Sequence, residues 1–312
     1  MQIFITTLNQ MIYLFAFIAI GYILVKVGVL NKDAAGVLSK LENNLFIPAL
    51  IMGTFLKNFN VQTLETAWRL LLFSLVIQLV MIPLSLLVGK LCDKDKYKQG
   101  IIAYGLAFSN FGFMGMAVVK ALFPELMMQY VIFTLVLWTL IYAWATPTLL
   151  IPVAQGGGIK ARLKSFCNPM FICILLGIVL GPLPITWPEP VLSVIDAAGN
   201  CMSPVAMLLT GITIGTVDIK SGFRAPATWV SCALRLIVIP LAALALFTVL
   251  PLPRDYLVCA FCTLAMPLGL SPVVIPAAYG KDTTLAATMA LVSHLLAVGT
   301  LPLMFMIMMK VL

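Results

Sequence analysis

Apolar residues run through this chain in long blocks that are separated by short polar or glycine-containing connections. Each block has about 17 residues or more, which is enough for an α-helix to cross the hydrocarbon core of a bilayer. The pattern predicts ten membrane-spanning helices and leaves no stretch for a soluble domain. The predicted helices cover residues 3–28, 36–56, 67–89, 100–123, 126–153, 168–184, 190–216, 226–250, 256–279 and 284–309. We therefore expect an all-α membrane protein.

Glycine and proline recur at equivalent places in the two halves of the chain. The pairs are separated by 155 to 157 positions, with one pair in each of five successive predicted helices: Gly21 with Gly177, Pro48 with Pro204, Pro83 with Pro240, Gly112 with Gly269, and Pro147 with Pro302. A repeat with an odd number of spans enters the membrane from the opposite face the second time. The pattern predicts two inverted five-helix repeats, residues 1–154 and 168–312, joined by a glycine-containing cytoplasmic linker at 155–167.

Composition and charge agree with this arrangement. Of the 312 residues, 62% are hydrophobic and 10% are charged, which is typical of an integral membrane protein. The first helix lacks the basic start and the cleavage site of a signal peptide, so we expect it to be retained. The net charge of +8 indicates orientation rather than binding to nucleic acid.

The basic residues are unevenly distributed between the two sets of connections. With the N-terminus outside, 13 of them fall on the cytoplasmic side and five on the other side. The cytoplasmic set is Lys26, Lys32, Lys40, Lys90, Lys94, Lys96, Lys98, Lys160, Arg162, Lys164, Lys220, Arg224 and Lys281, and the other set is Lys57, Arg69, Lys120, Arg254 and Lys310. This bias predicts that both termini lie outside the cytoplasm.

Two of the predicted helices, 100–123 and 256–279, contain residues that interrupt a helix. The interruptions are Phe108 to Gly115 and Ala265 to Pro272. Open backbone at membrane depth is tolerated only where protein or a water-filled cavity satisfies it, and paired interruptions point to a transporter's binding site.

The polar side chains at these interruptions are Ser109, Asn110 and Ser271. The half-helices that begin there, the second of them after Pro267, would direct free N–H groups toward the gap, which suits a carboxylate. Alternatively, these side chains only satisfy the opened backbone.

Other polar residues within the predicted helices are further candidates for binding substrate. Asn44 and Asn200 each precede a proline by four positions, so each offers an amide beside a freed carbonyl, or simply marks a kink. Gln78 and Arg235 share the repeat offset and hence a similar depth. An arginine within a span marks a functional site by default, although it can also snorkel to the interface or pair with a carboxylate.

Proton coupling has two candidates, Asp196 near the start of its helix and His294, the single histidine of the chain. Asp196 could instead be an interfacial residue, and His294 a hydrogen-bonded core residue. No motif predicts a cofactor or a metal site, because Cys259-x-x-Cys262 has no second cysteine pair to complete one.

At these residues the sequence resembles the auxin efflux carrier family. The resemblance rests on Asn110-x4-Gly115, Met266-Pro267-x-Gly269-x-x-Pro272, Asp196-Ala197 and Leu301-Pro302-Leu303, and it covers essentially the whole chain. It implies ten spans in inverted repeats, with crossed broken helices four and nine. It also implies a scaffold of spans 1, 2, 6 and 7, and a transport domain of spans 3–5 and 8–10 that carries substrate by an elevator-like shift.

Departures from the plant members of that family bear on the substrate. Met116-Ala117 stand where the plant proteins have a proline after the Met-Gly pair, and the central loop is short. The resemblance therefore implies a bacterial carrier of small organic anions in the inner membrane, with Asn110 and Pro267 at the two crossings. The expected partners are the organic anion and the bilayer, and the sequence leaves a homodimer open.

Other functions stay open at this point. A sodium-coupled organic-anion symporter or a cation/proton antiporter could share the fold, although the interruptions lack the carboxylates that cation sites usually need. An intramembrane enzyme is less consistent with the sequence, because Ser293 directly precedes His294 on the helix and no HExxH motif is present.

Overall fold

The computed structural model of the chain describes residues 2–31, 33–151, 166–216 and 220–312. All regular elements among these residues are helices, and one isolated β-bridge joins Ser109 to Leu268. The all-α prediction is therefore confirmed for the described residues. The predicted linker at 155–167 lies largely outside them.

Within the described ranges, six helical stretches are long and apolar enough to cross a membrane by length and composition. Four are single helices and two are composite, because short π- or 3₁₀-helical turns continue the α-helix. They are α1 (Gln2–Lys26), α4 (Val61–Cys92), η3–α7–η4 (Pro124–Leu126, Met127–Leu140 and Ile141–Leu150), α10 (Glu189–Thr216), α12–η6–α13 (Pro226–Ala233, Leu234–Val238 and Ile239–Phe247) and α16 (Thr284–Val311).

The other four predicted spans are shorter, broken or more polar than this. Two of them are divided into half-helices, one ends after 12 residues, and one carries Glu42, Asn43 and Asn44 at its centre. Their elements, together with the short helix α11 (Lys220–Phe223), are α2 (Ala34–Leu41), η1 (Glu42–Phe46), α3 (Ile47–Asn58), α5 (Lys96–Ala107), η2 (Phe111–Gly115), α6 (Met116–Leu122), α9 (Pro169–Leu180), α14 (Arg254–Ala265) and α15 (Ser271–Ala278).

Helix boundaries differ from the prediction where a cap decides them. The predicted start of the third helix is residue 67, but α4 begins at Val61 because the Asn60 side chain accepts a hydrogen bond from the Thr63 N–H at 2.9 Å. Such a cap satisfies one of the donors that a helix start leaves free. The cap extends α4 by two turns beyond its apolar core.

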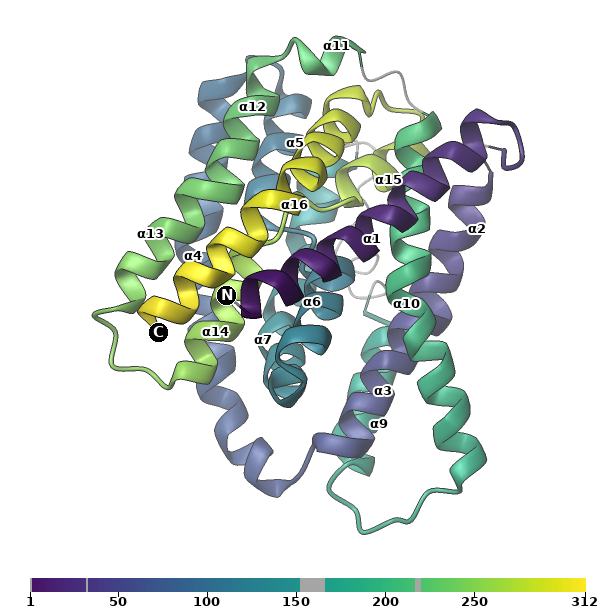
Figure 1. Cartoon of the computed structure of the whole chain (residues 1–312), viewed down its shortest axis with the longest axis vertical. Coiled ribbons are helices and arrows are strands. Elements are labelled where there is room, and N and C mark those ends of the chain that lie inside the picture. Colours follow the sequence, from purple (N-terminus) through teal and green to yellow (C-terminus); the bar gives the residue numbers. More distant parts are fainter. Residues whose placement is uncertain (1, 32, 152–165, 217–219) are drawn as a thin grey trace.

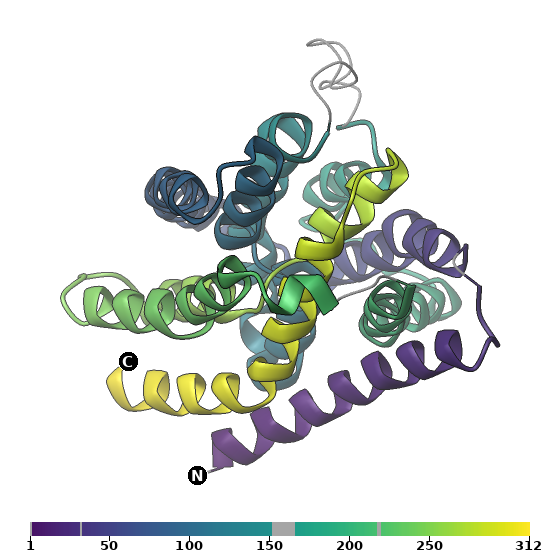
Figure 2. The same ribbon diagram turned by 90° about the horizontal axis from the view of Figure 1, so that it is seen from above.

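The helices form two groups that face each other (Figures 1 and 2). One group contains α2, α3, α9 and α10, and the other contains α4, α5, α12 and α13, with α6 and α7 between them. Helix α1 slants across the molecule and packs against both α10 and α16. Of the half-helices around the predicted interruptions, η2 packs against α10, whereas α5 packs against α4.

Helices α1 and α10 make their close approach at two glycines. A Cβ atom at Gly211 of α10 would collide with the backbone of Ile18 and Tyr22, and a Cβ atom at Gly21 of α1 would collide with the carbonyl of Leu208. Small residues at such contacts let the backbones of membrane helices pack closely, since the hydrophobic effect does not drive association within lipid.

The first prediction follows from this contact. We expect Gly211→Ala to lower the stability by about 1–3 kcal/mol, because the added methyl group has no space between the two backbones. Thermal unfolding of the purified protein in detergent measures the change. The matched control is Gly299→Ala in α16, where an added Cβ atom has no neighbour within 4 Å. Equal melting temperatures for the two variants would contradict the proposed contact.

Candidate functional site

Both predicted interruptions are present, and they meet. Helix α5 ends at Ala107 and η2 begins at Phe111, while α14 ends at Ala265 and α15 begins at Ser271. We call residues 108–110 and 266–270 the two breaks. They run antiparallel at the Ser109–Leu268 bridge, and the Asn110 N–H donates to the Pro267 carbonyl at 2.8 Å. Segments more than 150 positions apart thus satisfy part of each other's open backbone.

Arg235 holds the ends of α5 and α14 together. Its guanidinium donates to three backbone carbonyls, those of Leu106 at 2.8 Å, Thr263 at 2.7 Å and Met266 at 3.0 Å. The side chain is 1% exposed. Helix C-termini carry partial negative charge and leave carbonyls without partners, so a cation with several donors matches both needs. Snorkelling and carboxylate pairing, the two alternatives for Arg235, are therefore both wrong.

The breaks hold the Asn110 side chain between a helix start and a histidine. Its Nδ2 lies 2.9 Å from Nε2 of His294, and its Oδ1 lies 3.4 Å from the Met114 N–H. The other ring nitrogen of His294 is 2.7 Å from the Ala290 carbonyl. A carbonyl can only accept, so Nδ1 carries the proton and Nε2 accepts from the Asn110 amide. His294 is thus a hydrogen-bonded core residue that also fixes the orientation of Asn110.

A small cavity of about 20 Å³ lies at the breaks. Such a volume holds roughly one water molecule and no organic acid. Aromatic rings close it, with Trp138 packed edge-on against Phe111 at 5.0 Å between ring centroids. The lining residues are Tyr104, Phe108, Ser109, Asn110, Phe111, Gly112, Phe113, Trp138, Ile141, Gly269, Leu270 and Ser271. None of these residues is acidic.

The two half-helices that begin at the breaks do not supply equal numbers of free donors. At α15, the N–H groups of Val273 and Val274 both bond to the Leu270 carbonyl, and Pro272 has no N–H. At η2, the N–H groups of Met114 and Gly115 both bond to the Asn110 carbonyl in the same way, which leaves the N–H groups of the first three residues of η2 without an acceptor in their own helix. Helix α15 therefore contributes fewer free donors than η2, because Pro272 has no N–H and fewer residues precede its first bonded N–H group.

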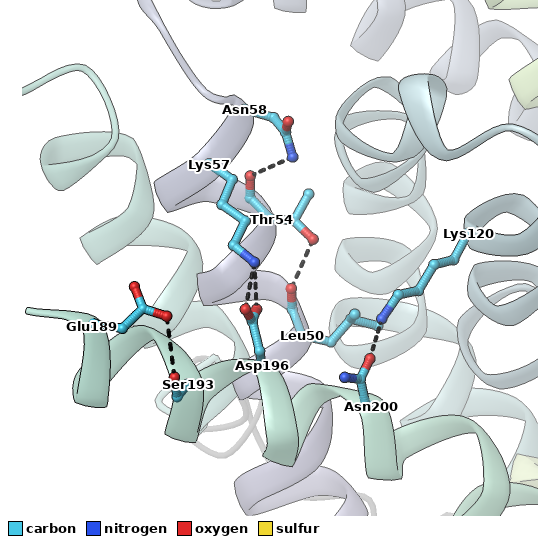
Figure 3. Close-up of polar contacts among 9 residues, drawn as sticks. All are labelled: Leu50, Thr54, Lys57, Asn58, Lys120, Glu189, Ser193, Asp196 and Asn200. Atoms are coloured by element: carbon cyan, nitrogen blue, oxygen red, sulfur yellow. Dashed lines mark hydrogen bonds and ion pairs between the residues drawn. The ribbon is translucent and has the colours of Figure 1, made fainter. Parts of the chain in front are cut away.

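A second polar region lies where α3 and α10 face α6 (Figure 3). Lys57 of α3 forms an ion pair with Asp196 of α10, with Nζ to carboxylate distances of 2.6 and 2.7 Å. Lys120 of α6 donates to the Asn200 side-chain oxygen of α10 at 2.6 Å. Two predicted residues, Asp196 and Asn200, therefore come together here, well away from the breaks along the chain.

Two cavities of about 180 and 170 Å³ adjoin this region. Leu50, Lys120 and Gly199 line both of them, so the cavities lie on either side of the same contact. Asn200 and Ser203 line the first, and Asp196 and Lys57 line the second. We call this pair of cavities the interface cavities. Unlike the cavity at the breaks, each has room for a small organic anion.

The remaining predicted residues lie elsewhere. Asn44 is exposed in η1, where its Nδ2 donates to the Lys40 carbonyl at 2.8 Å. Gln78 is buried in α4, and its side-chain oxygen has no partner among the described residues. Neither residue lines the cavity at the breaks or the interface cavities. The repeat offset predicts a similar depth in the membrane for Gln78 and Arg235. A similar depth does not bring the Gln78 side chain to the cavity at the breaks.

Sequence reasoning missed two charged residues. Lys120 was counted only as an orientation signal, although it ends the same half-helix that begins beside Asn110. Glu42 is fully buried in η1, and neither of its carboxylate oxygens has a partner among the described residues. A single acidic residue in an apolar block was the signal available for it.

The cysteines and the acidic residues give no indication of a metal centre. Among the described residues, no group of three His, Cys, Asp or Glu side chains could hold a metal ion. Cys259 and Cys262 are free thiols buried one turn apart in α14, consistent with packing as small apolar residues.

Comparisons with known proteins agree with a role in transport. A family described as "Membrane transport protein" matches the chain in two segments, residues 6–161 and 157–305. The chain is also similar to an uncharacterized transporter of Methanothermobacter thermautotrophicus, with 24% identity over 304 residues that cover 97% of this chain and 98% of the relative. Both similarities extend over nearly the whole length.

The second prediction concerns the arginine at the breaks. We expect Arg235→Leu to lower the stability by at least about 3 kcal/mol, because three carbonyls lose a charged donor in a dry interior. Arg235→Lys keeps the charge but not the planar fork of donors, so its effect should be intermediate. Size-exclusion profiles and thermal unfolding in detergent report the loss.

The control for this prediction is Arg254→Leu. Arg254 is exposed at the start of α14, and its one described hydrogen bond goes to the Met309 sulfur. An Arg235→Leu protein as stable as the Arg254→Leu protein would show that the arginine does not hold the breaks together.

Proposed function

Because the chain belongs to the membrane transport protein family, we propose that it is a secondary transporter of small organic anions, mono- or dicarboxylates, that works by alternating access. The observation that carries the proposal is the meeting of two helix breaks at a polar cavity whose lining contains no charged residue. The family supports transport, and the electrostatics of the breaks support the choice of an anion.

Four helix ends converge at the breaks, and their charges do not cancel. The C-terminal ends of α5 and α14 together carry about one negative charge, which Arg235 compensates through three hydrogen bonds. The N-terminal ends of η2 and α15 carry about half a positive charge each and face no acidic residue in the cavity lining. The net positive potential at the breaks favours a carboxylate over a cation.

The magnitude of this attraction limits how the anion binds. Each helix end contributes at most about 2 kcal/mol, whereas complete dehydration of an isolated ion costs tens of kcal/mol. The bound anion therefore keeps part of its water or meets further donors, of which Asn110, Ser109 and Ser271 line the cavity. This is why the site suits a small, hydrated carboxylate.

For the architecture, we propose ten membrane segments in two inverted five-helix repeats, residues 1–154 and 168–312. Equivalent contacts support the repeat, because Gly21 packs against α10 just as its counterpart Gly177 packs against Phe55 of α3. The charge bias places both termini outside the cytoplasm. For a bacterial carrier, the membrane would be the inner membrane.

The two helix groups suggest how the carrier moves. Elements α1, α2–η1–α3, α9 and α10 would form a scaffold, and the third to fifth and eighth to tenth segments would form a transport domain. Both breaks belong to the second set, and the interface cavities lie between the two sets. The 20 Å³ cavity at the breaks is too small for substrate, so the transport domain must shift against the scaffold, in an elevator-like movement, before substrate can bind there.

The third prediction tests the site at the breaks. Proteoliposomes containing the protein are assayed for uptake of labelled acetate, malonate and succinate. We expect Asn110→Ala to reduce uptake to near background, because the amide links the start of η2 to His294. The control is Asn43→Ala, whose side chain bonds only locally to Ser39 in an exposed turn. Unchanged uptake by Asn110→Ala would remove the assigned site.

The same assay addresses the coupling ion. Replacing external sodium with potassium should leave uptake unchanged, since no carboxylate lines the cavity at the breaks. A requirement for sodium would instead favour the sodium-coupled symporter.

The fourth prediction concerns proton coupling through His294. A protonated imidazole has two donors and no acceptor, so Nε2 would no longer accept from Nδ2 of Asn110. The amide would have to rotate, which changes the donors that the site presents to substrate. Asp196, the other proton-coupling candidate, is less suited because Lys57 holds both of its oxygens.

We therefore expect His294→Gln to flatten the dependence of uptake on external pH, because a glutamine side chain does not exchange a proton in this way. Initial uptake rates at a series of pH values, normalised to protein content, give the comparison. A His294→Gln profile that follows the wild-type profile would exclude His294 as the proton carrier.

A further inference from the structure

The interface cavities contain a cation whose charge is not balanced locally. Lys57 and Asp196 neutralise each other, since both carboxylate oxygens of Asp196 lie within 2.7 Å of the Lys57 Nζ. The described partner of Lys120 is the neutral side-chain oxygen of Asn200, at 2.6 Å. The three charged groups that line the interface cavities, Lys57, Lys120 and Asp196, thus sum to one positive charge; Glu189, also drawn in Figure 3, lines neither cavity.

Lys120 also has donors to spare. An ammonium group has three N–H donors, and one of them is used by Asn200 in the described contacts. The Asn200 amide adds two N–H donors on the same wall of the cavity. Gln10 and Tyr13 of α1 and Ser203 of α10 provide further polar groups in the lining. A carboxylate placed beside Lys120 would therefore meet several donors and one uncompensated charge.

This region is separate from the breaks. Lys120 lies ten positions after Asn110, which corresponds to about 15 Å along a helix. The 180 Å³ cavity runs beside Met116, Ala117 and Lys120 of α6, so it follows this half-helix away from the breaks. Lys120 and Asn200 are exposed, so an ion bound between them keeps part of its water, which limits the cost of desolvation.

We propose that Lys120 and Asn200 form a second carboxylate-binding site, which holds the substrate anion between the scaffold and the transport domain before it reaches the breaks. The ligand class is a small mono- or dicarboxylate, whose oxygens accept from Lys120 Nζ and from the Asn200 amide. This inference rests on the proposed function, and it adds a residue and a location that the breaks do not supply.

Lys120 and Asn200 come from different parts of the proposed machinery. Lys120 is on α6, in the transport domain, and Asn200 is on α10, in the scaffold. A purely mechanical link between the domains would need this hydrogen bond but no ligand. The experiment must therefore measure affinity for an anion as well as transport.

The test is isothermal titration calorimetry of the full chain in lipid nanodiscs with acetate, malonate and succinate at constant ionic strength. Chloride is the reference anion. We expect at least one acid to bind, with affinity about tenfold or more weaker in Lys120→Met, because a charged hydrogen bond is lost. Lys120→Arg should restore most of the affinity. Lys310→Met is the matched control, since it removes an exposed lysine at the end of α16 that lines neither interface cavity.

The outcomes separate this site from the site at the breaks. Asn110→Ala should keep binding in calorimetry while losing uptake, since its side chain does not line the interface cavities. Equal affinity of Lys120→Met and wild type, or no carboxylate binding by the wild type, would overturn the second site. Binding that depends on Lys120 without uptake of any acid would support the second site and contradict the proposed transport.

Discussion

The structure depends on how the open backbone at the two breaks finds hydrogen-bond partners. A helix that stops inside a membrane leaves carbonyls that lipid cannot satisfy, and each unsatisfied group costs several kcal/mol. Arg235 resolves this for two helices at once, because its planar fork of donors reaches the carbonyls of Leu106, Thr263 and Met266. Its charge also opposes the negative ends of both helices. Without such a residue, α5 and α14 could not end side by side in the interior.

Arg235 compensates the partial negative charge at the C-terminal ends of α5 and α14, and this bears on the proposal that the breaks bind an anion. Once Arg235 is committed to carbonyls, it is not available as a direct counter-ion for substrate, and the uncompensated charge lies at the helix N-termini. These ends present backbone N–H groups and the Asn110 amide instead of a mobile side chain. Donors that are fixed in this way need no reorganisation when an anion arrives. A weak but pre-organised site is suitable for a carrier, which must release its substrate as well as bind it.

The sequence predicted the parts of the structure that local chemistry determines. Pro267, Pro272 and Gly112 disfavour an apolar helix at or next to the breaks, so the breaks were visible in the printed sequence, as were their equivalent positions in the two halves. The helix ends were predicted less well, because caps such as Asn60 decide them. The sequence also did not show that one carbonyl at each break, that of Asn110 and that of Leu270, accepts two of the following N–H groups.

The sequence alone did not predict which residues far apart along the chain form hydrogen bonds with each other. Nothing in a single sequence relates Arg235 to the Leu106 carbonyl, 129 positions away, because any residue type can supply a carbonyl. The contact between Lys120 and Asn200, 80 positions apart, was hidden for a similar reason. Each residue had an adequate local explanation, an orientation signal for the lysine and a kink for the asparagine. Their meeting depends on the packing of α6 against α10, which the hydropathy pattern does not specify.

The sizes of the cavities connect these observations to movement. A site of about 20 Å³ at the breaks and cavities of about 170–180 Å³ at the interface cannot be equivalent states of one pocket, since different residues line them. In the proposed second site, an anion is held by Lys120 of α6 and Asn200 of α10 together, beside the hydrogen bond that joins these two residues. A ligand can shift a conformational equilibrium only by binding its states unequally. A carboxylate held by both residues would bind better while α6 and α10 are in contact, so in the proposed mechanism it leaves this site before the separation that the closed cavity at the breaks requires.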